Sequence, residues 1–273
     1  MLHYDHIDID TGSAQIHVTQ VGRGVPALVF LHYWGGSSRT WEQVIQPLVD
    51  SARCVALDHR GWGQSSAPDA GYAIGDMEAD ALAVITALPL TDYILIGHSM
   101  GGKVAQLIAS RRPAGLRGVV LVAPAPAKPV AVPDDVRAQM AAAYLSREAI
   151  IATLDGVLRH ATLSEELREQ VVQDSLAGSS EAKREWVESA ILEDVSADLA
   201  QIDVPVLVVA GRQDRVEPIE VLESHVLAEI PGARIEVIDE CGHLIPLEKP
   251  DVLSDRIAAF VDTVITARPA VNR

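Results

Sequence analysis

The chain has 273 residues, of which 48% are hydrophobic, and its formal net charge is −16. This length and composition can bury a substantial core and favour one domain with an insertion over two independent domains. The acidic field argues against nucleic acid, anionic membrane surfaces and polyanionic substrates as partners, and it favours neutral or weakly polar small molecules.

The N-terminal segment and the cysteines indicate the compartment. Residues 1–20 lack the basic flank and apolar core of a secretory signal, which predicts a cytoplasmic protein. The longest apolar runs are far shorter than the roughly 20 residues of a membrane-spanning helix. Cys54 and Cys241 cannot form a disulfide framework, and no His or Cys spacing matches a zinc pattern. We therefore expect no metal and no cofactor.

The predicted elements alternate between strands and helices along the chain. Two opening segments, 5–9 and 15–21, predict an antiparallel hairpin at one edge of a sheet. Six nearly continuous apolar runs of strand length follow, at 27–31, 54–57, 93–96, 119–122, 206–210 and 235–238. Stretches of helical periodicity lie between or after them, at 41–49, 77–88, 102–110, 219–229 and 252–265. This alternation predicts an α/β fold, with a mainly parallel sheet of about eight strands and helices on both faces.

One long interval breaks the alternation, between the strand that ends near Val122 and the strand that begins near Val204. It opens with a proline-rich stretch, 123–129, and continues with helical patterns at 135–144, 147–158, 164–176 and 180–194. We predict a core domain of residues 1–123 and 204–273, with a helical cap, residues 124–203, inserted after the sixth strand. The alternative is that these helices are packing layers that do not contact substrate.

The pentapeptide Gly97-His98-Ser99-Met100-Gly101 lies between a predicted strand and a predicted helix. This is the pattern of a nucleophile elbow, in which the serine occupies a strained turn. The residues two before and two after the serine must lack bulk because strand and helix nearly touch there. The pattern also arises by chance, so by itself it does not separate a catalytic Ser99 from a structural one.

A serine nucleophile requires a base and an acid that orients the base. Asp214 follows the strand 206–210 and would reach the same sheet edge as Ser99. His243 lies in the loop after the last predicted strand. Because the order Ser, Asp, His is the order of elbow hydrolases, we assign Ser99 as nucleophile, His243 as base and Asp214 as the orienting acid. Glu217 is the competing acid.

The oxyanion of a tetrahedral intermediate requires backbone N–H donors. Met100 would supply one donor. Trp34, in the glycine-rich turn 32–37, would supply the second, and Tyr33 is the alternative. Substrate contacts are predicted for Tyr33 and Trp34 and for three cap residues, Met140, Tyr144 and Trp186. Further apolar walls, or the core of the cap, are expected from Leu145, Leu154, Leu158 and Ile191.

Four motifs in order make the chain similar to the α/β-hydrolase superfamily, in its serine-nucleophile esterase and haloperoxidase-like branch. They are His32-Tyr33-Trp34-Gly35-Gly36, Asp58-His59-Arg60-Gly61-Trp62-Gly63-Gln64-Ser65, Gly97-His98-Ser99-Met100-Gly101-Gly102, and Asp214 with Gly242-His243. The resemblance extends over nearly the whole chain and implies a serine-hydrolase triad, an oxyanion hole and a cap. Relatives usually have glycine directly after the first histidine, so Tyr33 is expected to narrow or shape the acyl pocket.

Three charged residues near these motifs are predicted to take no part in the chemistry. Asp58 and Arg60 are expected to brace their turn by charge-assisted hydrogen bonds. Lys103 is expected on the surface of the helix after the elbow. Serine at the elbow also argues against dehalogenase and epoxide hydrolase chemistry, because those relatives place aspartate there.

The predicted function is acyl transfer, as a carboxylesterase or lactonase on a small to medium neutral ester or lactone. The same groups could instead hydrolyse a carbon–carbon bond or act as a perhydrolase, and they fit a lipase less well. Two further alternatives are a triad-bearing ligand receptor or signalling protein and a cofactor-free lyase or oxygenase. The oligomeric state is open, and a homodimer is one candidate.

Overall fold

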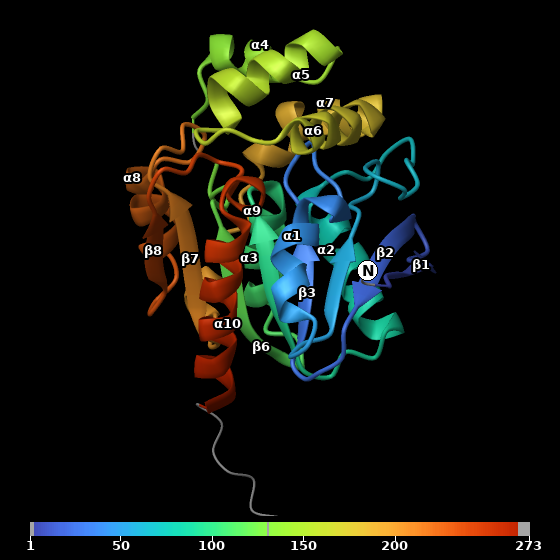
Figure 1. The fold of residues 1–273 in the computed structure, drawn as a ribbon, viewed down its shortest axis with the longest axis vertical. Helices are drawn as coiled ribbons and strands as arrows, with labels where there is room; N and C mark the ends of the chain where they lie inside the picture. The colour runs from blue at the N-terminus through green and yellow to red at the C-terminus, as the bar shows by residue number, and fades with distance from the viewer. Residues whose placement is uncertain (1–2, 130, 267–273) are drawn as a thin grey trace, which may run out of the picture.

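A computed structural model describes residues 3–129 and 131–266 (Figure 1). Its sheet has the strand order β1-β2-β4-β3-β5-β6-β7-β8, and every neighbouring pair from β4 onward is parallel. The pairs β1–β2 and β2–β4 are antiparallel. The strands are β1 (Asp5–Asp10), β2 (Gln15–Val21), β3 (Ala27–Leu31), β4 (Cys54–Leu57), β5 (Tyr93–His98), β6 (Leu116–Val122), β7 (Val206–Gly211) and β8 (Arg234–Ile238). The predicted fold class is confirmed.

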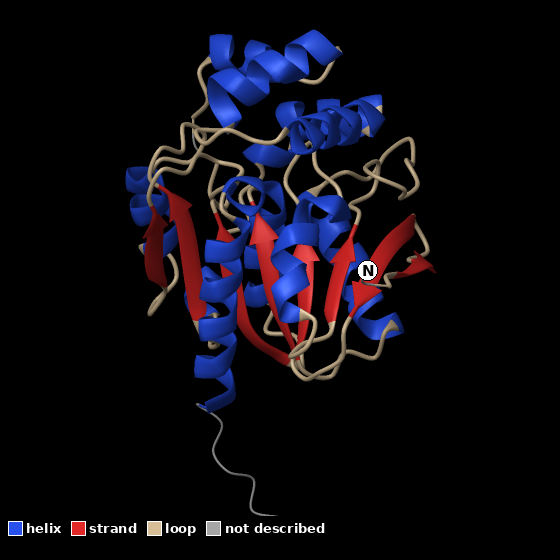
Figure 2. Ribbon diagram, viewed as in Figure 1, coloured by secondary structure: helices blue, strands red, loops and turns tan. Residues whose placement is uncertain are grey.

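Helices cover both faces of this sheet (Figure 2). Helices α1 and α10 pack on one face, and α2 and α3 pack on the other. The helices of the core are α1 (Glu42–Ile45), α2 (Ile74–Ala87), α3 (Met100–Ser110), α8 (Ile219–Leu222), α9 (Ile245–Glu248) and α10 (Pro250–Thr266). Shorter turns are η1 (Ser38–Trp41), η2 (Gln46–Leu48), η5 (Leu199–Gln201) and the π-helical η6 (Glu223–Leu227). None of the described helices is both long and apolar enough to cross a bilayer.

Burial on both faces explains why the parallel strands have continuous apolar runs instead of alternating ones. In β3, Val29 and Leu31 join the cluster that includes α2 and α3, whereas Leu28 and Phe30 join the cluster that includes α1 and α10. All four side chains are fully buried. A strand with both faces covered has no position at which a polar side chain would reach water.

Residues 124–203 are here called the inserted segment, and the helices between residues 134 and 188 lie over the carboxyl ends of the parallel strands (Figure 1). The helical elements of the segment are α4 (Asp134–Ala142), α5 (Arg147–Thr153), the π-helical η3 (Leu154–Leu158), α6 (Glu165–Ala177), α7 (Ser180–Glu188) and η4 (Ala190–Leu192), followed by the short η5. Ser146, Ser164 and Ser179 cap α5, α6 and α7, because each hydroxyl accepts a hydrogen bond from a backbone N–H of the first turn. Residues 1–2 and 267–273 of the predicted core domain lie outside the described residues.

Candidate active site

Ser99 lies on the sharp turn between β5 and α3, with φ 51° and ψ −113°. A non-glycine residue with positive φ is strained. A Cβ atom on Gly101 would collide with the carbonyl oxygen of Leu31, and one on Gly97 would collide with the carbonyl oxygen of Gly101. The two glycines therefore allow strand and helix to approach closely enough to form the turn.

The carboxylate of Asp214 and the imidazole of His243 form a buried pair. The Nδ1 atom of His243 lies 2.8 Å from Asp214 Oδ2. Because an ionised carboxylate only accepts hydrogen bonds, Nδ1 carries the proton of the neutral imidazole and Nε2 is left as an acceptor. Asp214 Oδ1 accepts from the amides of Val216 and Glu217, at 2.8 and 3.0 Å. The carboxylate is thus fixed, and it is Asp214, not the competing Glu217, that contacts His243.

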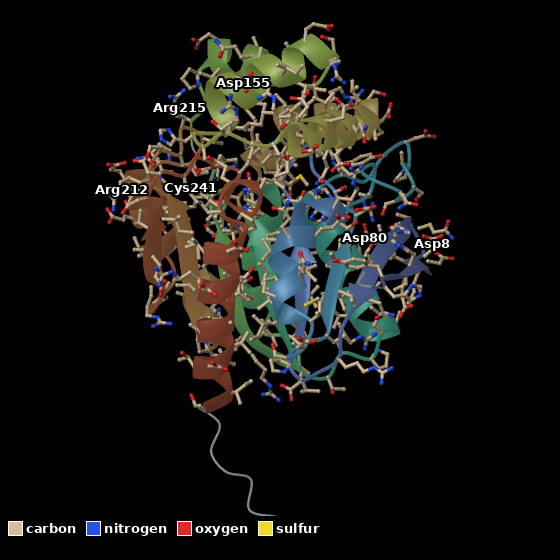
Figure 3. The ribbon with its side chains drawn as sticks, in the orientation of Figure 1. Asp8, Asp80, Asp155, Arg212, Arg215 and Cys241 are labelled. Atoms are coloured by element: carbon tan, nitrogen blue, oxygen red, sulfur yellow. The ribbon has the colours of Figure 1, made fainter. Side chains whose placement is uncertain are left out.

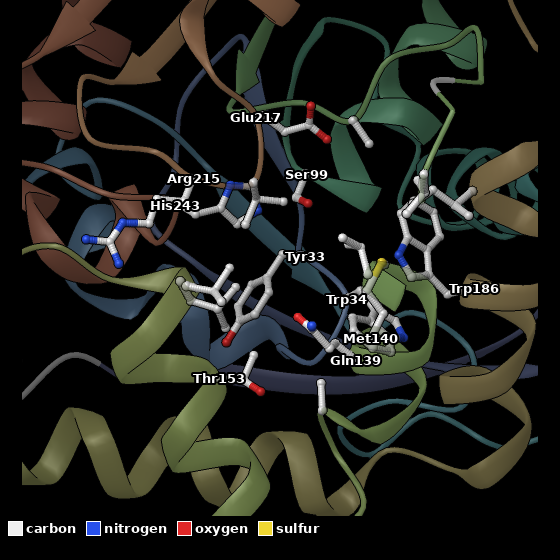
Figure 4. A pocket seen from close by; sticks show the side chains of 18 of the residues that line it. Tyr33, Trp34, Ser99, Gln139, Met140, Thr153, Trp186, Arg215, Glu217 and His243 are labelled. Carbon is white, nitrogen blue, oxygen red and sulfur yellow. The ribbon is translucent and has the colours of Figure 1, made fainter. Parts of the chain in front are cut away.

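Ser99 and His243 line one cavity at the carboxyl ends of the strands. Figure 4 shows the Ser99 side chain beside the His243 ring. The sequence order Ser, Asp, His thus corresponds to three side chains that the fold brings to one place. An imidazole with a free Nε2 next to a serine hydroxyl can accept the hydroxyl proton.

His98, which sequence reasoning treated only as part of the elbow motif, positions the His243 loop. Its Nε2 donates to the carbonyl oxygen of His243 at 2.8 Å. Burial, together with the neighbouring His243 ring, holds the pKa of His98 well below the ordinary value. The ring is therefore neutral and its Nδ1 is buried without a hydrogen-bond partner among the described residues. The sequence signal for this role was a histidine at the end of an apolar run, directly before the predicted nucleophile.

The glycine-rich turn after β3 is ordered by His32. The His32 Nδ1–H donates to the Tyr33 carbonyl at 2.7 Å, and its Nε2 accepts from the His59 amide at 3.0 Å. Neither the Trp34 amide nor the alternative Tyr33 amide has an acceptor within the described part of the chain. The Met100 amide belongs to the first turn of α3, where no helical carbonyl faces it. These amides can donate to an oxyanion.

Two hydroxyl groups of the inserted segment hold the backbone of the same turn. Tyr144 donates to the Trp34 carbonyl, and Ser175 donates to the Gly35 carbonyl, each at 2.9 Å. The Tyr144 and Trp34 rings pack with centroids 4.2 Å apart. A Cβ atom on Gly35 would lie 2.6 Å from the Tyr144 ring, so this close packing requires glycine.

A buried carboxyl group of α6 adds a third contact to this turn. Asp174 accepts from the Ser37 hydroxyl at 2.9 Å and from the Arg39 guanidinium at 3.1 Å. Burial raises the pKa of Asp174 to about 6, although Arg39 opposes the shift. Tyr144, Ser175 and Asp174 are together called the clamp below. No sequence pattern indicated the clamp, because the hydrogen-bonded residues lie more than a hundred positions apart.

The inserted segment also contacts the His243 loop. The amides of His243 and Leu244 both donate to the Leu158 carbonyl, at 2.8 and 3.2 Å. The Glu248 carboxylate accepts from the Gly242 amide and from the His160 amide, and so links this loop to the segment. The segment is therefore hydrogen-bonded to the loops on two sides of Ser99.

The cavity has a volume of about 620 Å³ and mostly apolar walls. The five predicted substrate-contact residues all line it, namely Tyr33, Trp34, Met140, Tyr144 and Trp186. Leu158 and Ile191 line it as well, whereas Leu154 is fully buried in the core. Polar lining residues that the sequence did not indicate are Lys128, Gln139, Thr153, Arg215 and, in this role, Glu217, and all of these except Lys128 are labelled in Figure 4.

Two sequence predictions about exposure are wrong. Leu145 is 74% exposed, because it lies in the turn between α4 and α5 and does not form a wall of the cavity. Lys103 is fully buried, because every residue of α3 is covered by the sheet and by neighbouring helices. Its Nζ donates to the Ile191 carbonyl at 2.9 Å, and burial lowers the pKa of Lys103 to about 8.

The prediction for Asp58 and Arg60 is confirmed. Asp58 accepts from the amides of Ser38 and Gln64, at 2.6 and 2.8 Å. The Arg60 guanidinium donates through two nitrogens to Asp80 on α2, each at 2.7 Å. Figure 3 labels Asp80. Both side chains brace the loop after β4. Within the described residues, no group of three or more His, Cys, Asp or Glu side chains could hold a metal ion.

Comparison with known proteins agrees with this arrangement. A family model described as alpha/beta hydrolase fold matches residues 26–250. The chain is 31% identical to a non-heme chloroperoxidase of Streptomyces lividans, over 87% of this chain and 92% of that protein. It is 30% identical to 3-oxoadipate enol-lactonase 2 of Acinetobacter baylyi, over 86% of this chain and 88% of that protein. A solved esterase from Exiguobacterium antarcticum superposes with a TM-score of 0.85 at 25% identity, covering 96% of this chain and 100% of the other.

Proposed function

The chain belongs to the α/β-hydrolase fold family, and from this premise we propose that it is a serine hydrolase that transfers acyl groups from small to medium neutral esters or lactones to water. The observation that carries the proposal is the Asp214–His243 pair, which lies beside the strained Ser99 in one cavity. A strained serine and a buried, oriented imidazole are both costly to a fold, and their combination fits nucleophilic catalysis.

In the first half of the cycle, Ser99 Oγ attacks the substrate carbonyl carbon while His243 Nε2 takes the hydroxyl proton. The negative charge that develops on the carbonyl oxygen is stabilised by the amides of Met100 and Trp34. His243 then gives the proton to the departing alcohol oxygen, and the acyl group stays on Ser99.

In the second half, His243 takes a proton from water, whose oxygen attacks the acyl carbon. His243 then returns this proton to Ser99 Oγ as the bond between Oγ and the acyl carbon breaks and the acid leaves. Asp214 keeps the proton of His243 on Nδ1 and stabilises the imidazolium that forms in each half. It remains ionised throughout. No cofactor enters these steps.

Substrate selection is assigned to the inserted segment, which would act as a cap and supplies Met140, Tyr144 and Trp186 to the cavity wall. The mostly apolar lining and the net charge of −16 favour neutral substrates. The similarity to a lactonase and to an esterase supports both substrate classes. A cytoplasmic location remains a prediction.

Perhydrolysis is the second candidate, and the similarity to a non-heme chloroperoxidase favours it. In this reaction hydrogen peroxide replaces water in the attack on the acyl enzyme, and a peracid leaves. The two reactions share the first half of the cycle. They differ only in the molecule that takes the acyl group from Ser99, which is water in hydrolysis and hydrogen peroxide in perhydrolysis.

The test is steady-state hydrolysis of p-nitrophenyl acetate, butyrate and octanoate by the wild type and by Ser99→Ala, with the exposed Ser224→Ala as a matched control. Loss of the nucleophile should reduce kcat on the order of a million-fold, and the control should keep wild-type rates. Peracid formation with added hydrogen peroxide would favour the second candidate. A wild type that stops after one turnover, or a Ser99→Ala variant as active as the wild type, would contradict the proposal.

A further inference from the structure

Glu217 presents a carboxyl group to the catalytic cavity. It lies three positions after Asp214, in the loop that follows β7, and its amide donates to Asp214 Oδ1 at 3.0 Å. This bond fixes the backbone of Glu217 relative to the catalytic groups. The side chain lines the cavity, and Figure 4 shows its carboxyl group just above Ser99 in that view.

Among the described residues, the Glu217 carboxyl group has no hydrogen-bond or ion-pair partner, unlike the other charged side chains at the cavity wall. Lys128 is paired with Glu229 at 2.7 Å, and Arg215 donates to the Gly156 carbonyl at 2.7 Å. The Glu217 carboxyl makes no hydrogen bond or ion pair with any residue that the structure describes. Lys103, the cation whose charge acts on it, donates instead to the Ile191 carbonyl.

Burial, reinforced by the negative charge of Asp214, raises the pKa of Glu217 well above the ordinary value. Both effects favour the neutral carboxylic acid, which has one O–H donor and one carbonyl acceptor. Glu217 is half-buried and its carboxyl group lines the cavity, so a ligand there could supply the hydrogen-bond partner that the described residues do not. In a mostly apolar cavity, this carboxyl offers a specific hydrogen bond.

We propose that the Glu217 carboxyl donates a hydrogen bond to a second oxygen of the substrate, a keto, hydroxyl or ether oxygen separate from the scissile ester or lactone group. The cavity would thereby select oxygen-bearing neutral substrates over plain alkyl esters. This inference rests on the proposed hydrolase function. A neutral acceptor fits better than an ammonium group, because Lys128 and Arg215 line the same cavity and Asp214 opposes ionisation of Glu217.

The test uses pairs of esters of nearly equal shape. On the acyl side, p-nitrophenyl 4-oxopentanoate is compared with p-nitrophenyl 4-methylpentanoate. On the alcohol side, 2-oxopropyl butyrate is compared with isobutyl butyrate. A cationic arm compares butyrylcholine with 3,3-dimethylbutyl butyrate. In each pair, kcat/KM is measured for the wild type, Glu217→Leu, Glu217→Gln and the exposed control Glu220→Leu.

The measured quantity is the ratio of kcat/KM within a pair, because a substitution that disturbs Ser99 or His243 affects both members alike. Glu217→Leu should lower the keto-to-alkyl ratio about three- to tenfold in at least one neutral pair. Glu217→Gln, which still has a donor, should keep most of the preference, and Glu220→Leu should keep all of it. A preference for the cationic ester that Glu217→Leu abolishes would overturn the assignment to a neutral oxygen.

Thermal unfolding gives an independent result. Glu217→Leu should raise Tm, because leucine removes an unpartnered polar group from an apolar wall. A lower Tm would show that the carboxyl group supports the fold, which contradicts the inference. If the wild type hydrolyses all the esters and no ratio changes, the inference alone fails. If the wild type hydrolyses none of them, the proposed function fails and the inference fails with it.

Discussion

The clamp makes a sharp prediction about Tyr144. Its hydroxyl donates to the carbonyl oxygen of Trp34, the residue whose amide is assigned to the oxyanion hole. Tyr144→Phe removes this one bond and keeps the aromatic ring that packs at 4.2 Å from the Trp34 ring. The substitution therefore releases the peptide group that follows Trp34 without opening a cavity.

The expected size follows from the remaining contacts. Leaving a buried carbonyl oxygen without a donor costs about 1–3 kcal/mol. Full loss of one oxyanion donor costs about 3–4 kcal/mol of transition-state stabilisation. Ser175 and Asp174 still hold the turn, so the Trp34 amide should shift without being lost. We expect the activation free energy to rise by about 1–2 kcal/mol, which corresponds to a fall in kcat of roughly 5- to 30-fold.

The assay is kcat and KM for p-nitrophenyl butyrate, together with urea unfolding. Tyr72→Phe is the matched control, because the Tyr72 hydroxyl donates to the Pro68 carbonyl at 2.8 Å, outside the clamp. Both variants should lose similar stability, and only Tyr144→Phe should lose kcat. If Tyr144→Phe keeps kcat within about twofold of the wild type, the clamp stabilises the fold without positioning the oxyanion donor.

Three further predictions concern stability. Burial raises the pKa of Asp174 to about 6, so its ionisation destabilises the native state as pH rises from 4 to 6. The stability of the wild type relative to Asp174→Asn should fall by about 2–3 kcal/mol over that range in urea unfolding, and a constant difference would refute this. Burial lowers the pKa of Lys103 to about 8, so stability is lost as pH falls from 10.5 through 8. The free energy of unfolding of the wild type should rise by about 2–3 kcal/mol relative to that of Lys103→Met between pH 8 and 10.5, and the same pH dependence in both proteins would contradict this. Gly101→Ala should destabilise by about 3 kcal/mol or more because its Cβ meets backbone, whereas Gly75→Ala, with open space, should be neutral or stabilising by about 0.5–1 kcal/mol. Equal melting temperatures for the two alanine variants would argue against a tightly packed elbow.

Features that depend on local residue patterns could be predicted from the sequence. Continuous apolar runs predicted the parallel strands, because a strand covered on both faces excludes polar residues wherever it lies in the sheet. The spacing of Gly97 and Gly101 around Ser99 predicted the elbow, because the requirement for small residues arises within five positions. The placement of Asp214 at the same sheet edge as Ser99 could be predicted because the loops after parallel strands meet at one edge of the sheet.

Burial and contacts that depend on the packing of distant elements could not be predicted from the sequence. Lysine is usually exposed, yet Lys103 is buried because α3 is covered on all sides. Leucine is usually buried, yet Leu145 lies in an exposed turn. The bond from Tyr144 to Trp34 joins residues 110 positions apart. That no described residue pairs with the Glu217 carboxyl group depends on the positions of all the neighbouring side chains. Such contacts depend on how whole elements pack against one another, a long-range property that no local pattern of residue types encodes.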